Sequence, residues 1–263
     1  MCLIAFAIEA HPRWRFVLAG NRDEFHARPS AAADWLEPAH GRFGGRDLEA
    51  GGGWLQAAAD GRVAAVTNVR LGRRETAPRS RGELVAGFIA GTAGAEDWLA
   101  RVMPQAGEYG PFNLLLWDGE AHYASNHPSP RQRRVAPGVH ALSNADLDTP
   151  WPKTEALRAA LAGWLALADV RDPDAHPGLT EPLFAALADP REAPEEALPR
   201  TGVPLDWERR LSAAFIRGED YGTRASSVLL ADDAGLWFEE RRFGPGGVAA
   251  GRSAAWLPRR SAA

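Results

Sequence analysis

The sequence predicts an α+β protein in which two mainly antiparallel sheets pack face to face between two outer layers of helices. Short apolar runs of strand length, joined by turns, come in pairs near both ends of the chain and in its middle. Helical periodicity occurs in two separate regions, residues 80–106 and residues 153–216. Because sheets and helices each bury one face against another element, strand pairs between two sets of helices favour a layered sandwich.

The first predicted hairpin places the only cysteine of the chain beside a run of polar residues. Residues 2–8 and 14–20 are apolar runs separated by a polar break, and the sequence Asn-Arg-Asp-Glu of residues 21–24 follows the second run. Runs of this length bounded by turn residues are typical of buried strands. Because the two strands of a hairpin are antiparallel, Cys2 and residues 21–24 are expected at the same end of the sheet.

Cys2 has two interpretations. Removal of Met1 would give Cys2 a free α-amine, so that a thiol with a pKa of roughly 8.5 and an amine with a pKa of about 7.7 to 8.0 would share one residue. Such an amine can take the thiol proton during attack and return it to a leaving amine. Alternatively, Cys2 is a small apolar residue that opens a buried strand, since free cysteine is among the most buried residue types.

Several motifs follow one another from residue 2 to about residue 240. They are Met1-Cys2-Leu-Ile, Ala19-Gly-Asn-Arg-Asp-Glu-Phe25, Gly51-Gly-Gly-Trp-Leu55, Ala65-Val-Thr-Asn68, Ser80-Arg-Gly-Glu-Leu-Val85, Leu142-Ser-Asn-Ala145 and Tyr221-Gly-Thr-Arg224. In these motifs the chain resembles the NRDE family, also called Transport and Golgi organisation protein 2-like. That family in turn resembles N-terminal nucleophile hydrolases of the cholylglycine hydrolase type. The resemblance implies a four-layer αββα sandwich formed by residues 1–263 as a single domain.

The resemblance also implies an oxyanion site. Two asparagines take part in acyl transfer in the cholylglycine hydrolase group, and the matching positions here are Asn68 and Asn144, each at a predicted strand end. Such a site needs donors directed at the oxygen that becomes negative in the transition state. Taken singly, an asparagine at a strand end is also a typical turn former.

Residues 21–24 allow two assignments. Cholylglycine-type enzymes carry an arginine and an aspartate three residues apart after the second strand, whereas Arg22 and Asp23 are adjacent here. Either Asp23 orients the α-amine while Arg22 stabilises the thiolate, or Asn21 and Glu24 take these two places. In the second case Arg22 and Asp23 would form a structural ion pair. All four residues are therefore candidates.

Arg224 is the last candidate, at the opening of a late strand. It is either a solvated surface charge or a cation that binds a carboxylate or stabilises a thiolate, and an arginine beside the thiol would lower the pKa of Cys2. If these residues form one site, they must converge in one crevice although they are far apart in the sequence. The expected set is Cys2, Asn21, Arg22, Asp23, Glu24, Asn68, Asn144 and Arg224.

Further elements are predicted along the chain. Strands are expected in a hairpin that turns at Asp60-Gly61 and ends at Asn68, and at residues 112–117, 121–125, 138–143, 223–231 and 236–243. Helices are expected within 80–106, behind a Ser80-x-x-Glu83 capping box, and at 153–166, 181–187 and 207–216. Residues 26–50 are predicted to be a loop because of their prolines and glycines, and residues 170–204 are expected to form turns. Only 254–257 suggests a last strand, and the final residues are expected to be disordered.

Composition excludes several classes of function. The formal net charge of −4 is spread without a large block of one sign, so the sequence does not predict nucleic acid binding. A single cysteine excludes an intramolecular disulfide, and no segment reaches the ~20 apolar residues of a membrane helix. The apolar start lacks a basic region and breaks at Glu9, which is unlike a signal peptide, so we expect a cytoplasmic protein. Lys153 is the only lysine among many arginines, which we attribute to coding bias.

Two functional hypotheses follow. The first is an N-terminal nucleophile amidohydrolase for a small non-peptide amide, with Cys2 as nucleophile, its α-amine as base and no metal or cofactor. The second is a protein of the same fold that binds a ligand without turnover, for which haem is the candidate because members of the family have been proposed to handle it. Cys2, His26 or His40 would then be axial ligands, although the chain has no C-x-x-C-H attachment motif.

Overall fold

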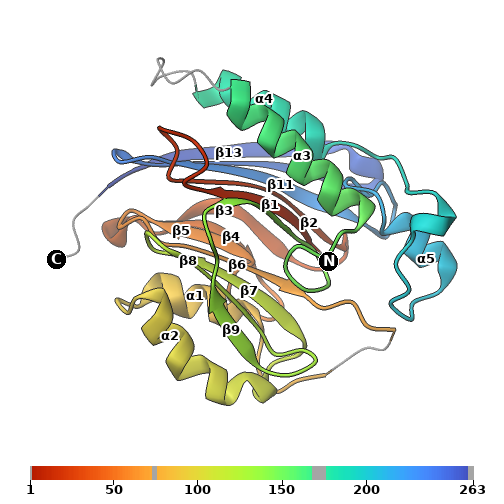
Figure 1. Ribbon diagram of the computed structural model, residues 1–263, viewed down its shortest axis with the longest axis horizontal. Helices are drawn as coiled ribbons and strands as arrows, with labels where there is room; N and C mark the ends of the chain where they lie inside the picture. Colours follow the sequence, from red (N-terminus) through yellow and green to blue (C-terminus); the bar gives the residue numbers. More distant parts are fainter. Residues whose placement is uncertain (1, 73–75, 168–175, 260–263) are drawn as a thin grey trace.

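The computed structural model describes residues 2–72, 76–167 and 176–259, which form two antiparallel sheets packed face to face. Helices α3 and α4 cover the outer face of one sheet, and helices α1 and α2 cover the outer face of the other (Figure 1). The predicted αββα sandwich of mainly antiparallel sheets is therefore confirmed.

The six-stranded sheet contains both the start and the end of the described chain. Its strands lie in the order β10-β1-β2-β11-β12-β13, and all neighbours are antiparallel. They are β10 (Gly138–Leu142), β1 (Cys2–Ile8), β2 (Phe16–Phe25), β11 (Tyr221–Ala231), β12 (Gly235–Phe243) and β13 (Ala249–Pro258). The N-terminal hairpin β1–β2 is thus held between strands that come from distant parts of the sequence.

The seven-stranded sheet follows the order of the chain from β3 to β9. Its strands are β3 (Ser30–Glu37), β4 (Arg42–Asp47), β5 (Leu55–Ala58), β6 (Val63–Asn68), β7 (Phe112–Trp117), β8 (Ala121–Ser125) and β9 (Arg131–Arg134). The hairpin predicted at Asp60-Gly61 is confirmed as β5–β6, since residues 59–62 connect the two strands.

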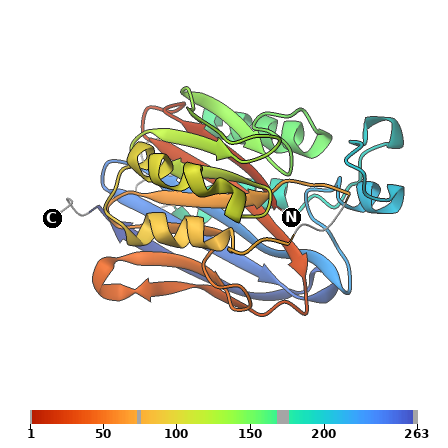
Figure 2. The same ribbon diagram turned by 90° about the horizontal axis from the view of Figure 1, so that it is seen from below.

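Two groups of helices form the outer layers. Helices α1 (Gly82–Ala90) and α2 (Ala95–Val102), with the short helix η2 (Met103–Glu108), lie side by side over the seven-stranded sheet (Figure 2). Helices α3 (Pro152–Leu167) and α4 (His176–Leu187) pack on the six-stranded sheet, and α5 (Leu205–Arg210) follows them. Short 3-10 turns occur at η1 (Pro38–His40), η3 (Glu195–Ala197) and η4 (Pro245–Gly247).

Strand β1 shows why the sequence forms this sandwich. All seven of its residues are buried, because alternate side chains point into two different cores. Ile4, Phe6 and Ile8 pack between the sheets, whereas Leu3 and its alternating neighbours pack beneath α3 and α4. Each large apolar side chain buried in this way stabilises the fold by about 1.5 to 3 kcal/mol. Cys2 follows the inner set and lies at the end of the sheet.

The prediction of a loop over residues 26–50 is wrong, because this region forms β3 and β4. Its prolines and glycines mostly stand at the ends of the strands: Pro38 lies in η1, and Gly41 closes η1 with a left-handed φ of 61°. Gly44 lies inside β4, where a Cβ atom would be 2.7 Å from the carbonyl oxygen of Leu55. Phe43 is buried between the sheets and packs edge-on against Phe238, with a centroid separation of 5.2 Å.

Other expectations differ in extent. Strand β9 was not predicted, β13 is longer than residues 254–257, and α5 ends at Arg210 rather than extending over 207–216. The capping box of α1 is confirmed in part, because the Ser80 amide donates to Glu83 Oε1 while the Ser80 hydroxyl accepts from the Gly82 amide. Part of the predicted turn region, residues 170–175, and the final residues 260–263 lie outside the described residues.

Candidate active site

Strand register brings Cys2 to the polar end of the sandwich. Cys2 lies opposite Arg22 in the β1–β2 pair, and Asp23 lies opposite Thr223 in the β2–β11 pair. Strand β6 of the other sheet ends at Asn68 on the same side, since the last three residues of β6 line one cavity together with Cys2. The prediction that the hairpin places Cys2 beside residues 21–24 is confirmed.

A cavity of about 140 Å³ lies at this end, between the two sheets. Its lining includes the predicted residues Cys2, Arg22, Asp23, Glu24 and Asn68. The N-terminal region of α1 closes one side with Ser80, Arg81 and Gly82, and the segment after β4 contributes Gly51, Gly53 and Trp54. Residues from both sheets and a helix therefore surround the thiol.

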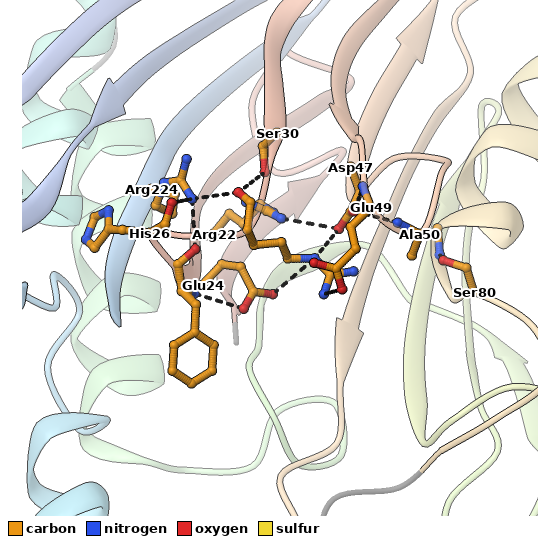
Figure 3. A network of polar contacts seen from close by, with 12 residues as sticks. Arg22, Glu24, His26, Ser30, Asp47, Glu49, Ala50, Ser80 and Arg224 are labelled. Carbon is orange, nitrogen blue, oxygen red and sulfur yellow. Dashed lines mark hydrogen bonds and ion pairs between the residues drawn. The ribbon is translucent and has the colours of Figure 1, made fainter. Parts of the chain in front are cut away.

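Part of the cavity lining is a network of charges (Figure 3). Asp47 at the end of β4 accepts from Arg28 Nε at 2.7 Å and lies 3.5 Å from Arg22 Nη2. Arg28 also pairs with Glu49 at 2.9 Å and lies 3.9 Å from Glu24. Hydrogen bonds from Arg28 hold the pKa of the Asp47 carboxyl below its usual range, against the effect of burial. The second assignment, in which Arg22 pairs with Asp23, is therefore wrong: Arg22 pairs with Asp47.

Cys2 itself is buried, with 7% of its surface exposed. Burial raises the pKa of the thiol, Asp23 and Glu24 raise it further, and Arg22 opposes them. Arg22 acts in the expected direction, but desolvation outweighs the cation, so the pKa of the thiol lies above its ordinary value and not below it. A thiol in this environment is protonated at neutral pH and needs a base in order to attack.

Asp23 is buried on the other face of β2, toward the helical layer. Its Oδ1 atom accepts a hydrogen bond of 2.7 Å from the Thr223 hydroxyl, which in turn accepts from the Ile216 amide. Burial raises the pKa of Asp23, while Lys153 and the Thr223 hydrogen bond oppose the shift. Asp23 is thus a carboxyl held in a fixed orientation directly beside the start of β1.

Asn68 and Asn144 lie next to each other and to Cys2. Asn144 Nδ2 donates to the backbone oxygen of Asn68 at 2.9 Å and to its side-chain oxygen at 3.1 Å. The neighbouring Ser143 hydroxyl donates to the Cys2 carbonyl oxygen at 2.9 Å. Because the Asn68 oxygen accepts from Asn144, the Asn68 amide group is oriented with its NH₂ away from Asn144, where it makes only a 3.4 Å contact with the Val69 carbonyl.

This arrangement gives the two asparagines different tasks. Asn68 lines the cavity and can offer a donor to a bound group, whereas Asn144 is buried at 1% exposure and holds Asn68. Asn144 also accepts from the Arg70 amide through its backbone oxygen, at 2.7 Å.

Asn21 and Arg224 do not reach this cavity. Asn21 is fully buried toward the helices, where Nδ2 donates to the carbonyl oxygens of Leu187 and Ala214 and Oδ1 accepts from the Ser226 hydroxyl. Arg224 Nη1 donates to the carbonyl oxygens of Phe25, His26 and Arg28, and so fixes the turn after β2 (Figure 3). The predicted convergence is wrong for these two residues, because their side chains are occupied by backbone carbonyls elsewhere.

Two cations that the sequence interpretation left aside belong to this region. Arg81 lines the cavity, and its Nη1 atom donates a hydrogen bond of 3.2 Å to the Pro111 carbonyl oxygen. Burial lowers the pKa of Arg81, and the thiol of Cys2 opposes the shift. Lys153, in the first turn of α3, is 5% exposed. Its status as the only lysine among thirty basic residues was the signal that could have identified it.

A second cavity of about 690 Å³ adjoins the first. Glu24, Arg28, Asn68 and Arg81 line both of them. Aromatic rings form part of its wall: Phe25 packs edge-on against Tyr221 at 5.0 Å, and Tyr221 against Trp207 at 5.4 Å. The small chamber at Cys2 therefore opens into a wider and partly aromatic one.

Relatives cover nearly the whole chain. Residues 1–245 match the family description Transport and Golgi organisation 2. The chain belongs to this family. The Transport and Golgi organization protein 2 homologs of Bos taurus and Homo sapiens are 34% and 32% identical over 262 residues, which is 92% of each chain. The Transport and Golgi organization protein 2 of Drosophila melanogaster is 26% identical over 255 residues, 88% of each chain.

Solved structures give the fold of this member of the Transport and Golgi organisation 2 family. A conjugated bile acid hydrolase from Clostridium perfringens matches with a TM-score of 0.55 over 97% of this chain and 92% of that chain, at 7% identity. At such identity the likeness concerns the fold alone. It shows that the chain has the N-terminal nucleophile hydrolase fold that the sequence resemblance implied.

The geometry gives haem little support. His26 and His40, the histidines considered as axial ligands, line neither of the two cavities, and His40 pairs with Glu37 on the surface at 2.9 Å. Cys2 lines a chamber of about 140 Å³, below the roughly 300 to 1,000 Å³ of typical ligand pockets.

Among the described residues, no group of three His, Cys, Asp or Glu side chains is arranged to hold a metal ion. No helix in the described ranges is long and apolar enough to span a bilayer.

Proposed function

We propose that the chain is an amidohydrolase that cleaves the C–N bond of a small non-peptide amide, with Cys2 as nucleophile after removal of Met1. The observation that carries this proposal is the convergence of Cys2, Arg22, Asp23 and Asn68 at one cavity between the two sheets. The fold supports it, since a solved structure of similar fold is that of a conjugated bile acid hydrolase. That solved protein is the C2A mutant of the bile acid hydrolase.

The buried thiol of Cys2 is protonated and therefore needs a base, which is the α-amine of the same residue. The α-amine of Cys2 takes the thiol proton as sulfur attacks the amide carbon. The C–N bond then breaks, the leaving nitrogen receives that proton, and a thioester forms on Cys2. Water loses a proton to the same amine, attacks the thioester and releases the acid, and the sulfur regains a proton.

The surrounding residues have distinct roles in these steps. The Arg22 guanidinium opposes the rise in the pKa of the thiol and so favours the thiolate. Asp23, fixed by Thr223, orients the α-amine. Asn68 Nδ2 donates to the oxygen that becomes negative during attack, and Asn144 keeps Asn68 in the required orientation.

The two joined cavities indicate how a substrate would lie. The reacting amide fits the small chamber at Cys2, and the rest of the molecule would occupy the wider cavity beside Phe25, Tyr221 and Trp207. Arg81 lines both cavities, so that an anionic group on the substrate would find a guanidinium at the junction.

An activity screen with amide and thioester substrates tests the proposal. It is run on protein whose loss of Met1 is confirmed by intact mass, with the Cys2→Ala variant as matched control. We expect release of amine and acid by the wild type and none by the variant. Turnover that persists in Cys2→Ala, or in protein that retains Met1, would contradict the mechanism.

A further inference from the structure

A cluster of four buried charges lies behind the Cys2 cavity. Its members are Asp23 from β2, Arg70 after β6, Lys153 from α3 and Glu208 from α5, which are 1%, 4%, 5% and 3% exposed. Two are cationic and two are anionic, so their formal charges balance. Buried charges are rare unless they are paired, and the way in which these four are paired is informative.

Arg70 and Glu208 form a closed pair. Arg70 Nη1 donates to Glu208 Oε2 at 2.8 Å, and the other carboxylate oxygen accepts from the amide and hydroxyl of Thr201 at 2.7 and 2.6 Å. Arg70 Nη2 also donates to the Leu211 carbonyl, and its guanidinium stacks on Trp151 at 4.7 Å. The Glu208 carboxylate is therefore already fully engaged.

Lys153 has no comparable partner. Among the described residues, no oxygen lies within hydrogen-bond distance of its Nζ atom, which is shielded from solvent. Lys153 stands in the first turn of α3, which packs on β1 and β10, and its charge interacts with those of Asp23 and Cys2.

The charges facing Lys153 are those of Cys2, Asp23, Arg70 and Glu208. Burial lowers the pKa of Lys153 to about 8, Arg70 lowers it as well, and Asp23, Cys2 and Glu208 oppose the shift. The side chain is thus still an ammonium at neutral pH. Since Glu208 is engaged by Arg70, Asp23 is the carboxylate whose charge Lys153 offsets.

We propose that Lys153 is a positioning residue whose ammonium keeps Asp23 ionised and thereby keeps it able to hold the α-amine of Cys2. This inference rests on the proposed function for the role of Asp23. Without Lys153, the buried Asp23 carboxylate would lose the largest of the effects that oppose the rise of its pKa, and it would take up a proton at higher pH. A protonated Asp23 no longer attracts the amine.

The single lysine makes a direct test possible. With lysine labelled by ¹³C at Cε, the protein gives one lysine signal, which we expect to titrate near pH 8 rather than near 10.4. Substitution Asp23→Asn should lower this midpoint by roughly 1 pH unit, because an attractive charge is lost. Asp47→Asn is the matched control, a carboxylate of the same cavity that faces Arg28 instead, and should leave the midpoint in place. A midpoint near 10.4, or one that Asp23→Asn does not move, would overturn the inference.

A second arm measures the consequence for the thiol. In Lys153→Met, the acid limb of the pH profile of turnover should move up by roughly 1 pH unit, whereas Lys153→Arg, which keeps the charge, should move it less. A purely structural role would lower activity at all pH values without moving the limb, and that result would contradict the inference. The NMR arm does not depend on turnover, so failure of the proposed amidohydrolase activity and failure of the Lys153–Asp23 coupling give different results.

Discussion

Asn21 and Asn68 are both asparagines at one end of the sandwich, and the structure separates them. Asn21 is closed, because its NH₂ group donates to two carbonyl oxygens and its oxygen accepts from Ser226. Asn68 is open, because Asn144 fixes its oxygen while its NH₂ group has only a long contact with Val69 and borders the cavity. A side chain whose hydrogen bonds are all satisfied within the protein holds the fold, and one with an unused donor in a cavity can bind a ligand.

The buried ions show the same contrast. Arg70 and Glu208 satisfy each other, whereas Lys153 lies near Asp23 without forming a hydrogen bond to any described residue. In both cases one of two similar groups has its hydrogen bonds satisfied and the other does not. The difference between closed and open groups therefore predicts which substitutions reduce activity and which reduce stability.

The largest expected effect is on turnover by Asn68→Ala. Loss of one oxyanion donor typically lowers kcat by about 10² to 10³-fold. Stability should fall by only about 1 kcal/mol, because the lost NH₂ group makes no short hydrogen bond and Asn144 Nδ2, which loses the Asn68 side-chain oxygen, keeps its bond to the Asn68 backbone oxygen. Steady-state kinetics and urea unfolding measure the two effects. A kcat within threefold of the wild type would remove Asn68 from the reaction.

Asn21→Ala should show the reverse. The substitution leaves the Leu187 and Ala214 carbonyls and the Ser226 hydroxyl without their buried partner, at a cost of about 2 to 4 kcal/mol in the free energy of unfolding. The folded variant should keep its kcat, since Asn21 faces the helices. If activity is lost while stability is kept, the distinction between the two asparagines is wrong.

Arg81→Met tests the cation at the junction of the two cavities. For substrates that carry an anionic group, KM should rise by roughly tenfold, because a hydrogen bond to a charged group is worth about 1.5 to 3 kcal/mol. A matched neutral substrate should be affected less. Equal changes for both substrates would show that Arg81 supports the cavity wall rather than a bound anion.

The smallest effect concerns a closed ion pair away from the cavity. The His140 ring donates a 2.8 Å hydrogen bond from Nδ1 to Asp148 Oδ2, and this bond raises the pKa of His140. This stabilisation is fully present below the unfolded pKa of about 6.5 and is lost as pH rises through the higher folded pKa. We expect at most about 1 kcal/mol from this partly exposed pair, and Asp148→Asn should flatten the decline of stability with pH. A decline of the same size in the variant would exclude the pair as its cause.

The sequence predicted best where neighbouring residues decide the structure. Strands β7 and β8 begin and end as expected, because apolar runs flank the Asp118-Gly119 turn. Cys2 and Arg22 lie side by side because a hairpin determines its own register.

It predicted less where the partner is distant. Arg22 pairs with Asp47, which lies in a region that was predicted to be a loop because of its glycines and prolines. The Arg224 side chain donates its hydrogen bonds to carbonyl oxygens of the turn after β2. The Lys153 ammonium has no hydrogen-bond partner among the described residues because of how α3 packs over β1, and no local sequence pattern predicts this packing.

The most direct test of the account is whether an acyl group becomes attached to Cys2. Protein lacking Met1 is mixed with a slowly hydrolysed amide or thioester, quenched in acid and analysed by intact and peptide mass spectrometry. Because Cys2 is the only cysteine, any thioester must form there. We predict an acyl adduct on the N-terminal peptide that builds up and then decays, and that is absent from Cys2→Ala. Substrate turnover without such an adduct, or an adduct that persists in Cys2→Ala, would contradict the central role of Cys2.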